Sequence, residues 1–399
     1  MTATNRYPLA RLLQKRGCNI LGINTGTSMD GLDLALIEIK GGGQIEAIRI
    51  LKTASYRFPM PVRRTLAHLA DADSVSKEEV ARAHFALGDW MGGRVLEFAR
   101  RRNGGRLPDL IASHGQTIGH FPNAGQSASS RTRATWQIGS TAAIAHRTRV
   151  VTIGDFRSSD VAAGGMGAPL SGYYHYLLFG DRHVVLNLGG IANISATQGS
   201  RNRMEILAFD IGPANMMLDT IARTALGRPY DANGRMAAQG TPDQSLIRRI
   251  LASAYFQRRP PKTCGREQFG PRAVQHWFFG NGRGDRRSHA QVADLLATAT
   301  EVTAQAISRA VTKWVEPFTP ARSLILVGGG SRNRFLTGRL SECLAGWIVQ
   351  SSDDIGIPAQ YVEPAGFAVL AYETLHNRPG NLGGGTGASP AVLGSISLP

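Results

Sequence analysis

The sequence lacks the features that mark several large classes of protein. It has only three cysteines, at positions 18, 264 and 343, and this odd number of widely spaced thiols excludes a disulfide framework and a cysteine-based zinc site. No run of about 18 apolar residues occurs, so we expect no membrane span. The basic N-terminus has no apolar stretch, which argues against a signal peptide. Together these absences favour a cytoplasmic protein.

Lysine is equally scarce. Only six of the 45 basic residues are lysine, and the formal net charge is +16 over 399 residues. Such a charge is compatible with nucleic-acid binding, but the basic runs are short and no ladder of aromatic residues accompanies them. Arginine spread over a solvated surface explains the charge more simply. We therefore expect no nucleic-acid partner and keep such binding as an alternative that rests on charge alone.

The common nucleotide-binding motifs are absent as well, since the chain has neither a Walker loop nor a Gly-x-Gly-x-x-Gly turn between a strand and a helix. Glycine itself is abundant, with 47 residues, and Gly-rich turns follow apolar runs at residues 26–31, 189–190 and 328–330. Backbone N–H groups in such turns can form a concave site for phosphate. One turn of this kind is often only a hairpin, but three in comparable positions indicate a nucleotide site.

The order of the apolar runs indicates two similar α/β halves. Each half opens with three predicted strands, at residues 18–23, 32–39 and 44–51 and again at 183–188, 191–196 and 205–209. Long helices are predicted at residues 76–102, 214–226 and 290–315, and Ser76 with Glu79 fits a capping box. We expect a nucleotide to bind in a cleft between two lobes.

The boundary between the predicted lobes follows the strand at residues 150–153. We assign residues 1–155 to the N-terminal lobe, with residues 366–399 packing back onto it. Residues 156–365 then form the C-terminal lobe.

Asp210 is the leading candidate for acid–base chemistry. It follows the apolar run at residues 206–209 and precedes Gly212 and Pro213, so a strand end would hold its carboxylate rigidly beside a helix N-terminus. Such a carboxylate can take a proton from water or from a hydroxyl group. The alternative is that Asp210 only caps the helix that starts near residue 214.

Two further polar groups follow predicted strands. Asp155 and Asp160 flank Arg157, and His114 stands beside Gln116 after the run at residues 110–112. The group around His114 suits hydrogen bonding to a hydroxyl-rich ligand. A local ion pair and a structural histidine are the alternatives.

Ten short motifs, collinear over residues 19–399, together resemble the anhydro-N-acetylmuramic acid kinase family of the sugar kinase–actin superfamily. Among them are GTSMDGLD at 26–33, SHGQT at 113–117, GDFR at 154–157, LNLGGIAN at 186–193, FDIGPAN at 209–215, TCGRE at 263–267 and GGGSRN at 328–333. The resemblance implies a two-lobed actin-like sugar-kinase fold. In that fold each lobe is a mixed sheet flanked by helices.

The resemblance also implies a reaction and its partners. The family opens the 1,6-anhydro bridge of anhydro-N-acetylmuramic acid and phosphorylates O6 with ATP and Mg²⁺, in peptidoglycan recycling. Asp210 matches the general base that activates water, and family members tend to be homodimers.

The implied ligand-binding residues fall into two sets. Matched to ATP are Gly26, Thr27, Ser28, Met29, Asp30, Gly31, Leu32, Asp33, Gly189, Gly190, Gly328, Gly329, Gly330 and Asn333, with Asp30 also expected to reach Mg²⁺ through water. Matched to the sugar are Ser113, His114, Gln116, Arg157, Asp160 and Glu363. Arg157 would pair with the lactyl carboxylate.

The chain departs from the family pattern at several positions. Asn24-Thr25 replaces the usual Met-Ser, and Met166, Ala214 and Pro364 replace Gln, Gly and a small residue. These changes bear on substrate preference and rate. They also motivate a second hypothesis, a catalytically silent anhydrosugar sensor of the same fold.

Overall fold

The computed structural model describes residues 8–26, 29–123, 132–199, 205–280, 287–382 and 385–399. Contacts within the chain divide it into two units, Met1–Leu178 with Tyr361–Pro399, and Phe179–Gln360. The first unit thus extends beyond the predicted boundary at residue 155. One reason is that the Tyr174 ring packs near Phe367, with ring centroids 6.5 Å apart.

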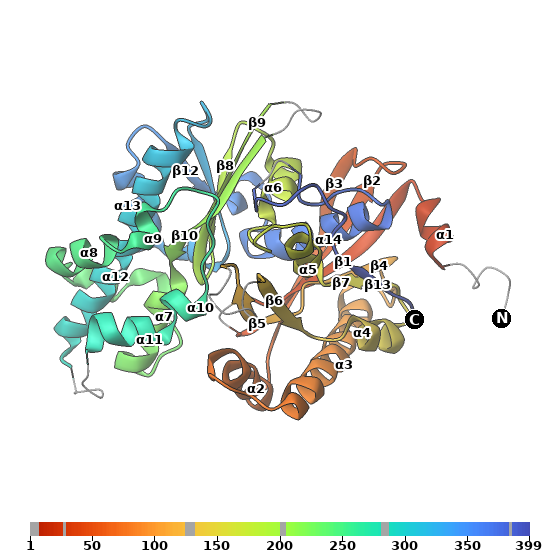
Figure 1. Cartoon of the computed structure of the whole chain (residues 1–399), viewed down its shortest axis with the longest axis horizontal. Helices are drawn as coiled ribbons and strands as arrows, with labels where there is room; N and C mark the ends of the chain where they lie inside the picture. Colours follow the sequence, from red (N-terminus) through yellow and green to blue (C-terminus); the bar gives the residue numbers. More distant parts are fainter. Residues whose placement is uncertain (1–7, 27–28, 124–131, 200–204, 281–286, 383–384) are drawn as a thin grey trace. The chain divides into compact units, whose positions relative to one another are not determined.

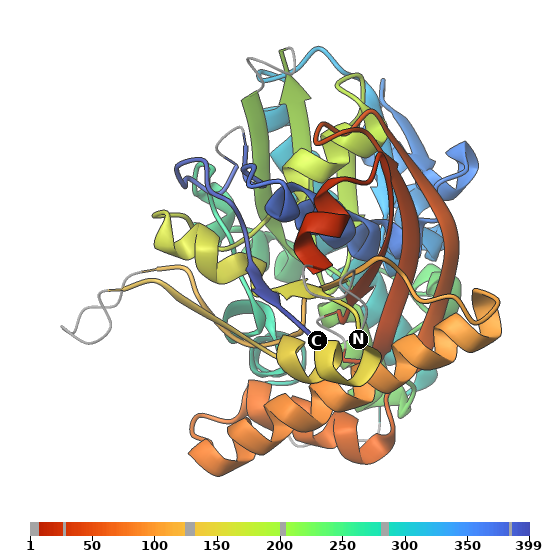
Figure 2. The same cartoon turned by 90° about the vertical axis from the view of Figure 1, so that its right-hand side faces the viewer.

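The first unit is built on a six-stranded mixed sheet in the order β13-β7-β4-β1-β2-β3 (Figure 1). The strands β1, β2 and β3 form an antiparallel meander, and β4 and β7 run parallel to β1. Strand β13 near the C-terminus pairs with β7 and forms one edge of the sheet (Figure 2). The strand bounds are β1 Gly17–Asn24, β2 Gly31–Lys40, β3 Ala47–Arg57, β4 Leu110–Ser113, β7 Thr152–Gly154 and β13 Ser395–Ser397.

Helices cover both faces of this sheet. The helices of the first unit are α1 Pro8–Leu13, α2 Met60–Asp71, α3 Lys77–Arg102, α4 Thr141–Thr148, α5 Phe156–Ala162, α6 Ser171–Phe179 and α14 Val362–Leu375, and the hairpin β5 Gln116–Phe121 with β6 Ala134–Ile138 stands apart from the main sheet. Leu21, Ile23 and Leu34 pack with residues of α2 and α3 in one core. The capping box predicted at Ser76 and Glu79 starts α3.

The opposite face of the sheet carries α14. The carbonyl oxygen of Pro364 lies only 1.7 Å from the position that a Cβ on Gly22 would occupy. Glycine in β1 is therefore what allows the first turn of α14 to approach the strand so closely.

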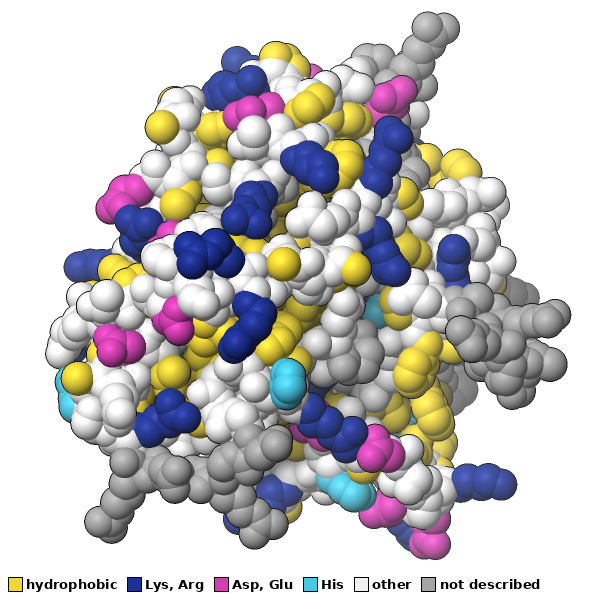
Figure 3. All heavy atoms as spheres, turned by 60° about the vertical axis from the view of Figure 1, so that its left-hand side comes forward, with side chains coloured by type: hydrophobic (Ala, Val, Ile, Leu, Met, Phe, Trp, Pro, Cys, Tyr) yellow, Lys and Arg dark blue, Asp and Glu magenta, His cyan; other side chains and the backbone are white. Residues whose placement is uncertain are grey.

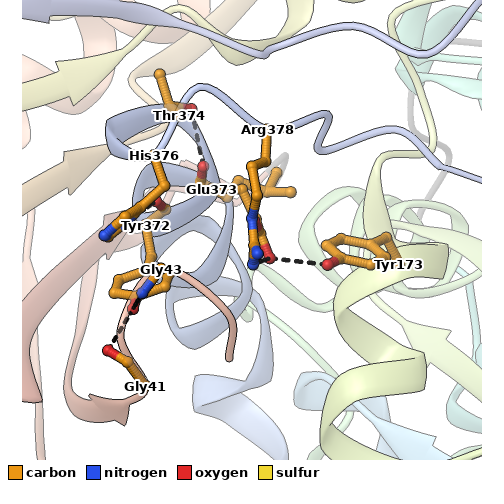
Figure 4. A network of polar contacts seen from close by, with 9 residues as sticks. Gly41, Gly43, Tyr173, Tyr372, Glu373, Thr374, His376 and Arg378 are labelled. Atoms are coloured by element: carbon orange, nitrogen blue, oxygen red, sulfur yellow. Dashed lines mark hydrogen bonds and ion pairs between the residues drawn. The ribbon is translucent and has the colours of Figure 1, made fainter. Parts of the chain in front are cut away.

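The C-terminal end of α14 is fixed by buried polar contacts (Figure 4). The Glu373 carboxylate accepts a hydrogen bond of 2.8 Å from the Tyr173 hydroxyl and pairs with the Arg378 guanidinium at 2.6 Å. The Tyr372 hydroxyl donates to the carbonyl of Gly41 at 3.0 Å. One helix is thereby joined to α6, to the C-terminal segment and to the β2–β3 turn.

The second unit repeats the same plan with a five-stranded sheet in the order β10-β9-β8-β11-β12 (Figure 1). Its antiparallel meander β8, β9 and β10 is followed by β11 and β12, which run parallel to β8. Its elements are β8 Val184–Leu188, β9 Ile191–Gln198, β10 Glu205–Pro213, α7 Asn215–Leu226, α8 Gln244–Leu251, α9 Ala254–Gln257, α10 Arg266–Phe269, α11 Pro271–Val274, α12 His289–Ala310, β11 Ser323–Val327, α13 Arg334–Cys343 and β12 Ile348–Ser351.

The main core of the second unit lies on one face of its sheet. Leu186, Ile194 and Phe209 pack there with residues of α7, α8, α12 and α13. Because side chains alternate along a strand, Asn187, Asn193 and Asp210 point to the other face.

The repeated sheet order confirms the predicted α/β class with a mixed sheet in each half. No helix in the described part of the chain is long and apolar enough to cross a membrane. On the face drawn in Figure 3, Lys and Arg side chains are spread among acidic, apolar and other side chains.

Candidate active site

The candidate base Asp210 lies within β10, not at its end. The strand continues to Pro213, because its pairing with β9 resumes after a bulge. The Asp210 N–H donates to the carbonyl of Lys262 at 3.0 Å. Ala214 is the N-cap of α7 and has no side-chain cap hydrogen bond. The alternative in which Asp210 caps this helix is therefore wrong.

Three donors hold Asp210. Its Oδ2 accepts hydrogen bonds from the Thr263 hydroxyl and, at 3.0 Å, from the Cys264 N–H, while the Tyr255 hydroxyl donates to its backbone carbonyl at 2.6 Å. The residue is only 6% exposed. The first two donors fix the orientation of the carboxylate, and Tyr255 fixes the backbone of the same residue.

A buried lysine, Lys262, lies next to Asp210 and accepts its N–H through the backbone carbonyl. The Lys262 ammonium donates to the Tyr255 carbonyl at 3.2 Å and lies 4.6 Å from the centre of the Tyr255 ring. Burial lowers the pKa of Lys262 to about 8. Burial likewise raises the pKa of Tyr255, with the neighbouring Cys264 and Asp210 adding to the shift.

Asp210 is the outer member of a polar row across three strands. In the β-sheet register Asp210 lies opposite Asn193, and Asn193 lies opposite Asn187. The Oδ1 atoms of both asparagines are buried and have no hydrogen-bond partner. We name Asn187, Asn193 and Asp210 the second polar row.

The two Gly-rich turns of this unit lie beside that row. A Cβ on Gly328 would be 2.3 Å from Asn187 Oδ1, and a Cβ on Gly330 would be 2.7 Å from the Leu188 side chain. The carbonyls of Gly189 and Gly190 accept hydrogen bonds from the first N–H groups of α7. The structure thus brings together two of the turns predicted to hold phosphate.

Asn333 has a different environment from the one expected of a phosphate ligand. Its Oδ1 accepts the Leu336 N–H at 3.1 Å, so its side chain caps α13. Contact with ATP at this position stays a prediction.

The first unit has a matching row, which we name the first polar row. Asn24 lies opposite Asp33, and Asp33 lies opposite Ser55, on β1, β2 and β3. Here the members have partners, because the Ser55 hydroxyl donates to the Asp33 carboxylate and the Asn24 Nδ2 donates to Glu363 at 3.3 Å. Glu363 belongs to α14, on the face where Gly22 admits that helix.

The turn before β2 is only partly described. Thr27 and Ser28 lie outside the described residues, Leu32 is buried in the core, and the Met29 N–H donates to the Gly26 carbonyl at 3.1 Å. The Asp30 carboxylate pairs with Arg63 at 3.0 Å. At Gly31, a Cβ would lie 2.3 Å from the Tyr56 carbonyl, so glycine is needed there for packing.

His114 and Arg157, predicted to lie near the sugar, are in direct contact. The Arg157 Nε donates to His114 Nε2 at 2.8 Å, and His114 Nδ1 lies 2.9 Å from the Gly115 carbonyl. These partners require a neutral imidazole with its proton on Nδ1. Burial and the Arg157 charge keep the pKa of His114 well below its usual range, so this histidine is neutral near neutral pH. Its role in this arrangement is to orient Arg157.

Thr25 connects this pair to the first Gly-rich turn. Its hydroxyl donates to the same Gly115 carbonyl at 2.8 Å, and it is only 3% exposed. In the unusual Asn24-Thr25 pair, Asn24 thus contacts the predicted site residue Glu363, and Thr25 shares its acceptor with His114.

Asp160 is buried and accepts hydrogen bonds from its own chain. The Gly167 N–H donates to Oδ2 at 2.8 Å, and Asn381 and Thr386 donate to Oδ1 at 2.8 and 2.7 Å. These contacts anchor the C-terminal segment. The Gly167 carbonyl in turn accepts Arg157 at 2.7 Å, so Asp160 acts on the site by positioning Arg157.

Three buried polar atoms near His114 have no hydrogen-bond partner. They are Ser113 Oγ, Gln116 Oε1 and Gln137 Oε1. Buried polar groups in folded proteins are normally paired, so these atoms fit a hydroxyl-rich or amide-bearing ligand. Gln137 was not among the predicted ligands.

The remaining departures from the family pattern have simple structural settings. Ala214 has φ −128°, so this position does not need the positive φ that would favour glycine. The Met166 side chain is buried, and its N–H donates to the Thr386 carbonyl at 3.2 Å. Pro364 stands in the first turn of α14, where proline is tolerated.

The model of the anhydro-N-acetylmuramic acid kinase family matches residues 18–399. The chain belongs to this family. An anhydro-N-acetylmuramic acid kinase from Gloeobacter violaceus is 39% identical over 94% of this chain and 97% of the relative. Those from Caldanaerobacter subterraneus and Salinibacter ruber are 34% and 35% identical over 98% and 95% of this chain, and 99% and 96% of each relative.

Among solved structures, the activator of the 2-hydroxyisocaproyl-CoA dehydratase from Clostridium difficile with bound ADPNP is similar to the chain. The match has a TM-score of 0.41 and 12% sequence identity, and it covers 90% of this chain and 95% of that chain.

A kinase of this family would use a divalent cation with its nucleotide. No group of three or more His, Cys, Asp or Glu side chains in the described ranges could hold a metal ion. Mg²⁺ bound mainly by phosphates and water needs only one or two carboxylates. The exposed Asp30 carboxylate beside the first turn fits that limited requirement.

Proposed function

We propose that this chain uses ATP to open the 1,6-anhydro bridge of anhydro-N-acetylmuramic acid and to phosphorylate O6, giving N-acetylmuramic acid 6-phosphate. The family match over residues 18–399 supports the reaction. The observation that carries the mechanism is the carboxylate of Asp210, which two donors orient through one oxygen.

In this reaction Asp210 takes a proton from water as the water oxygen attacks the anomeric carbon. The bond between that carbon and O6 breaks, O6 takes the γ-phosphoryl group, and ADP leaves. The proton on Asp210 then passes to solvent, so water, sugar and ATP are fully accounted for in the two products. Phosphoryl transfer itself needs mainly positioning and stabilisation of charge.

The first unit would supply the sugar contacts. A guanidinium held by His114 and Gly167 can receive the lactyl carboxylate, as Arg157 is fixed at two of its nitrogens. Ser113, Gln116 and Gln137 offer the unpaired polar atoms that sugar hydroxyl and acetamido groups need.

Gly-rich turns are the ligands predicted for the nucleotide. The predicted ligands are the backbone at residues 26–31, 189–190 and 328–330, which can approach phosphate closely. Asp30 would reach Mg²⁺ through water. When bound, this ion neutralises phosphate charge.

The test is a steady-state assay for ADP and 6-phosphosugar with purified protein and anhydro-N-acetylmuramic acid. We expect both products in equal amounts, and we expect Asp210→Asn to lower kcat by about 10³-fold or more while ATP still binds. Near-normal turnover by this variant would reject the assigned base. Sugar binding without ADP formation by the natural protein would favour a sugar sensor instead.

A further inference from the structure

The second polar row contains two acceptor atoms that the protein itself does not use. Asn187 is 3% exposed, and its Oδ1 and that of Asn193 are both buried without a partner. An acceptor in this state loses its hydrogen bonds to water and gains none in return, which costs free energy. Such atoms in a folded protein commonly receive a donor from a ligand or a bound water molecule.

The position of Asn193 indicates which group can donate a hydrogen bond to its Oδ1. Asn193 and Asp210 are directly opposite in the β9–β10 register, so their side chains leave the sheet on the same face. Cβ atoms of such cross-strand pairs are about 4.5–5.5 Å apart. A water molecule that forms two hydrogen bonds of about 2.8 Å can bridge acceptor atoms carried by side chains whose Cβ atoms are this close.

We propose that Asn193 Oδ1 accepts one hydrogen of the water molecule whose other hydrogen points at the Asp210 carboxylate. This inference rests on the proposed function and names a second residue that binds the reacting water. With both hydrogens held, a lone pair of the water oxygen is directed away from the sheet toward the sugar. Asp210 then receives the proton as the new bond to the anomeric carbon forms, and Asn193 keeps its hydrogen bond to the remaining hydroxyl.

The amide at position 193 is suited to this task for an electrostatic reason. A neutral acceptor holds the water without adding a second negative charge beside Asp210, and a second charge would favour protonation of the base. Tyr255 of α9 and the adjoining Thr263 and Cys264 donate hydrogen bonds to Asp210, and the charged Lys262 contacts it through its backbone carbonyl.

Two substitutions of Asn193 test the proposal, with Ser195→Ala as the matched control. Ser195 is on the same strand and points to the same face, two residues from Asn193, and it is 3% exposed. Asn193→Ala should lower kcat by about 10- to 100-fold, with KM for ATP and for the sugar within about threefold of the natural protein. Ser195→Ala should leave kcat near its normal value.

Asn193→Asp keeps the shape and one acceptor but adds a charge. We expect it to retain more activity at high pH than Asn193→Ala and to move the acid limb of the kcat–pH profile upward by about one pH unit. A role for Asn193 in folding alone would lower protein yield or thermal stability without this shift.

The outcomes separate the two proposals. Normal turnover by the natural protein together with kcat within twofold of normal in Asn193→Ala would overturn the role of Asn193 and leave the proposed function standing. An unshifted acid limb in Asn193→Asp would also overturn it. Absence of 6-phosphosugar formation by the natural protein would overturn both.

Discussion

The two units use the same five-strand order, and each places a row of three polar side chains across its antiparallel meander. In the first unit the row is Asn24, Asp33 and Ser55, and its members bond to one another or to α14. In the second unit the row is Asn187, Asn193 and Asp210, and both asparagine oxygens are without partners. We call the first polar row closed, because its members have hydrogen-bond partners, and the second polar row open, because its two asparagine oxygens have none.

The cause of this difference lies in what packs on each sheet. In the first unit, Gly22 admits the first turn of α14 and thereby brings Glu363 to Asn24. At the equivalent place in β8, two residues before Asn187, stands Val185. We infer that the first, closed row only positions its own residues, whereas the second, open row binds the reacting water beside Asp210.

Among variants that test this difference between the two rows, Gly22→Ala should have the largest effect on stability. The added methyl group would overlap the Pro364 carbonyl, so α14 must shift from the face that carries the first polar row. We expect the free energy of unfolding in urea to fall by about 3 kcal/mol or more.

Gly17→Ala is the control on the same strand, because nothing lies within 4 Å of a Cβ there. Its stability should change by less than about 0.5 kcal/mol. Equal stability of the two variants would mean that α14 does not depend on this close approach.

A smaller effect is expected when Asn24 of the first polar row loses its hydrogen bond. Asn24→Met restores the residue that is usual in the family pattern and removes the hydrogen bond to Glu363. The loss of about 1 kcal/mol should lower kcat/KM for the sugar about fivefold.

The exposed Asn19 on the same strand supplies the control Asn19→Met. Glu363→Gln should cost less in the Asn24→Met background than in the natural protein, since the two residues share one hydrogen bond. Additive effects in this double-mutant cycle would show that Asn24 does not act through Glu363.

The smallest effect concerns the lysine behind the second row and is confined to alkaline pH. The pKa of Lys262 is lowered from 10.5 to about 8 in the folded chain, mainly by burial. Between these values the unfolded chain binds more protons than the folded one, so this residue makes stability rise with pH.

Lys262→Met should remove that rise, while Lys52→Met, at an exposed position, should keep it. The measurement is the urea midpoint of each protein from pH 7.5 to 10.5. A rise of the same size in Lys262→Met would mean that another group causes it.

Local pattern was enough to predict most elements of the fold. The alternation in the apolar runs located the two meanders, and Ser76 with Glu79 located the start of α3. These features depend on residues that are neighbours in the sequence. The lobe boundary at residue 155 differs from the division in the structure because contacts such as that of Tyr174 with Phe367 join segments far apart in the chain.

Sequence pattern indicated candidate residues for the site but not the partners that hold them. Asp210 was identified from a strand-end pattern, yet the strand continues because its pairing with β9 resumes after a bulge. Asp160 was predicted to lie near the sugar, and its hydrogen bonds to Asn381 and Thr386, more than 200 residues away, could not be predicted from local pattern. The role of Asn193 depends on strand register, which a single sequence does not reveal.

The most direct test of the account compares one carboxylate from each row in a single-turnover experiment with saturating ATP and anhydro-N-acetylmuramic acid. Asp210→Asn should slow the formation of 6-phosphosugar by about 10³-fold or more. Asp33→Asn, in the closed row, should remain within about tenfold of the natural protein. Similar losses in the two variants, or the larger loss at position 33, would contradict the division between a closed, positioning row and an open, reacting one.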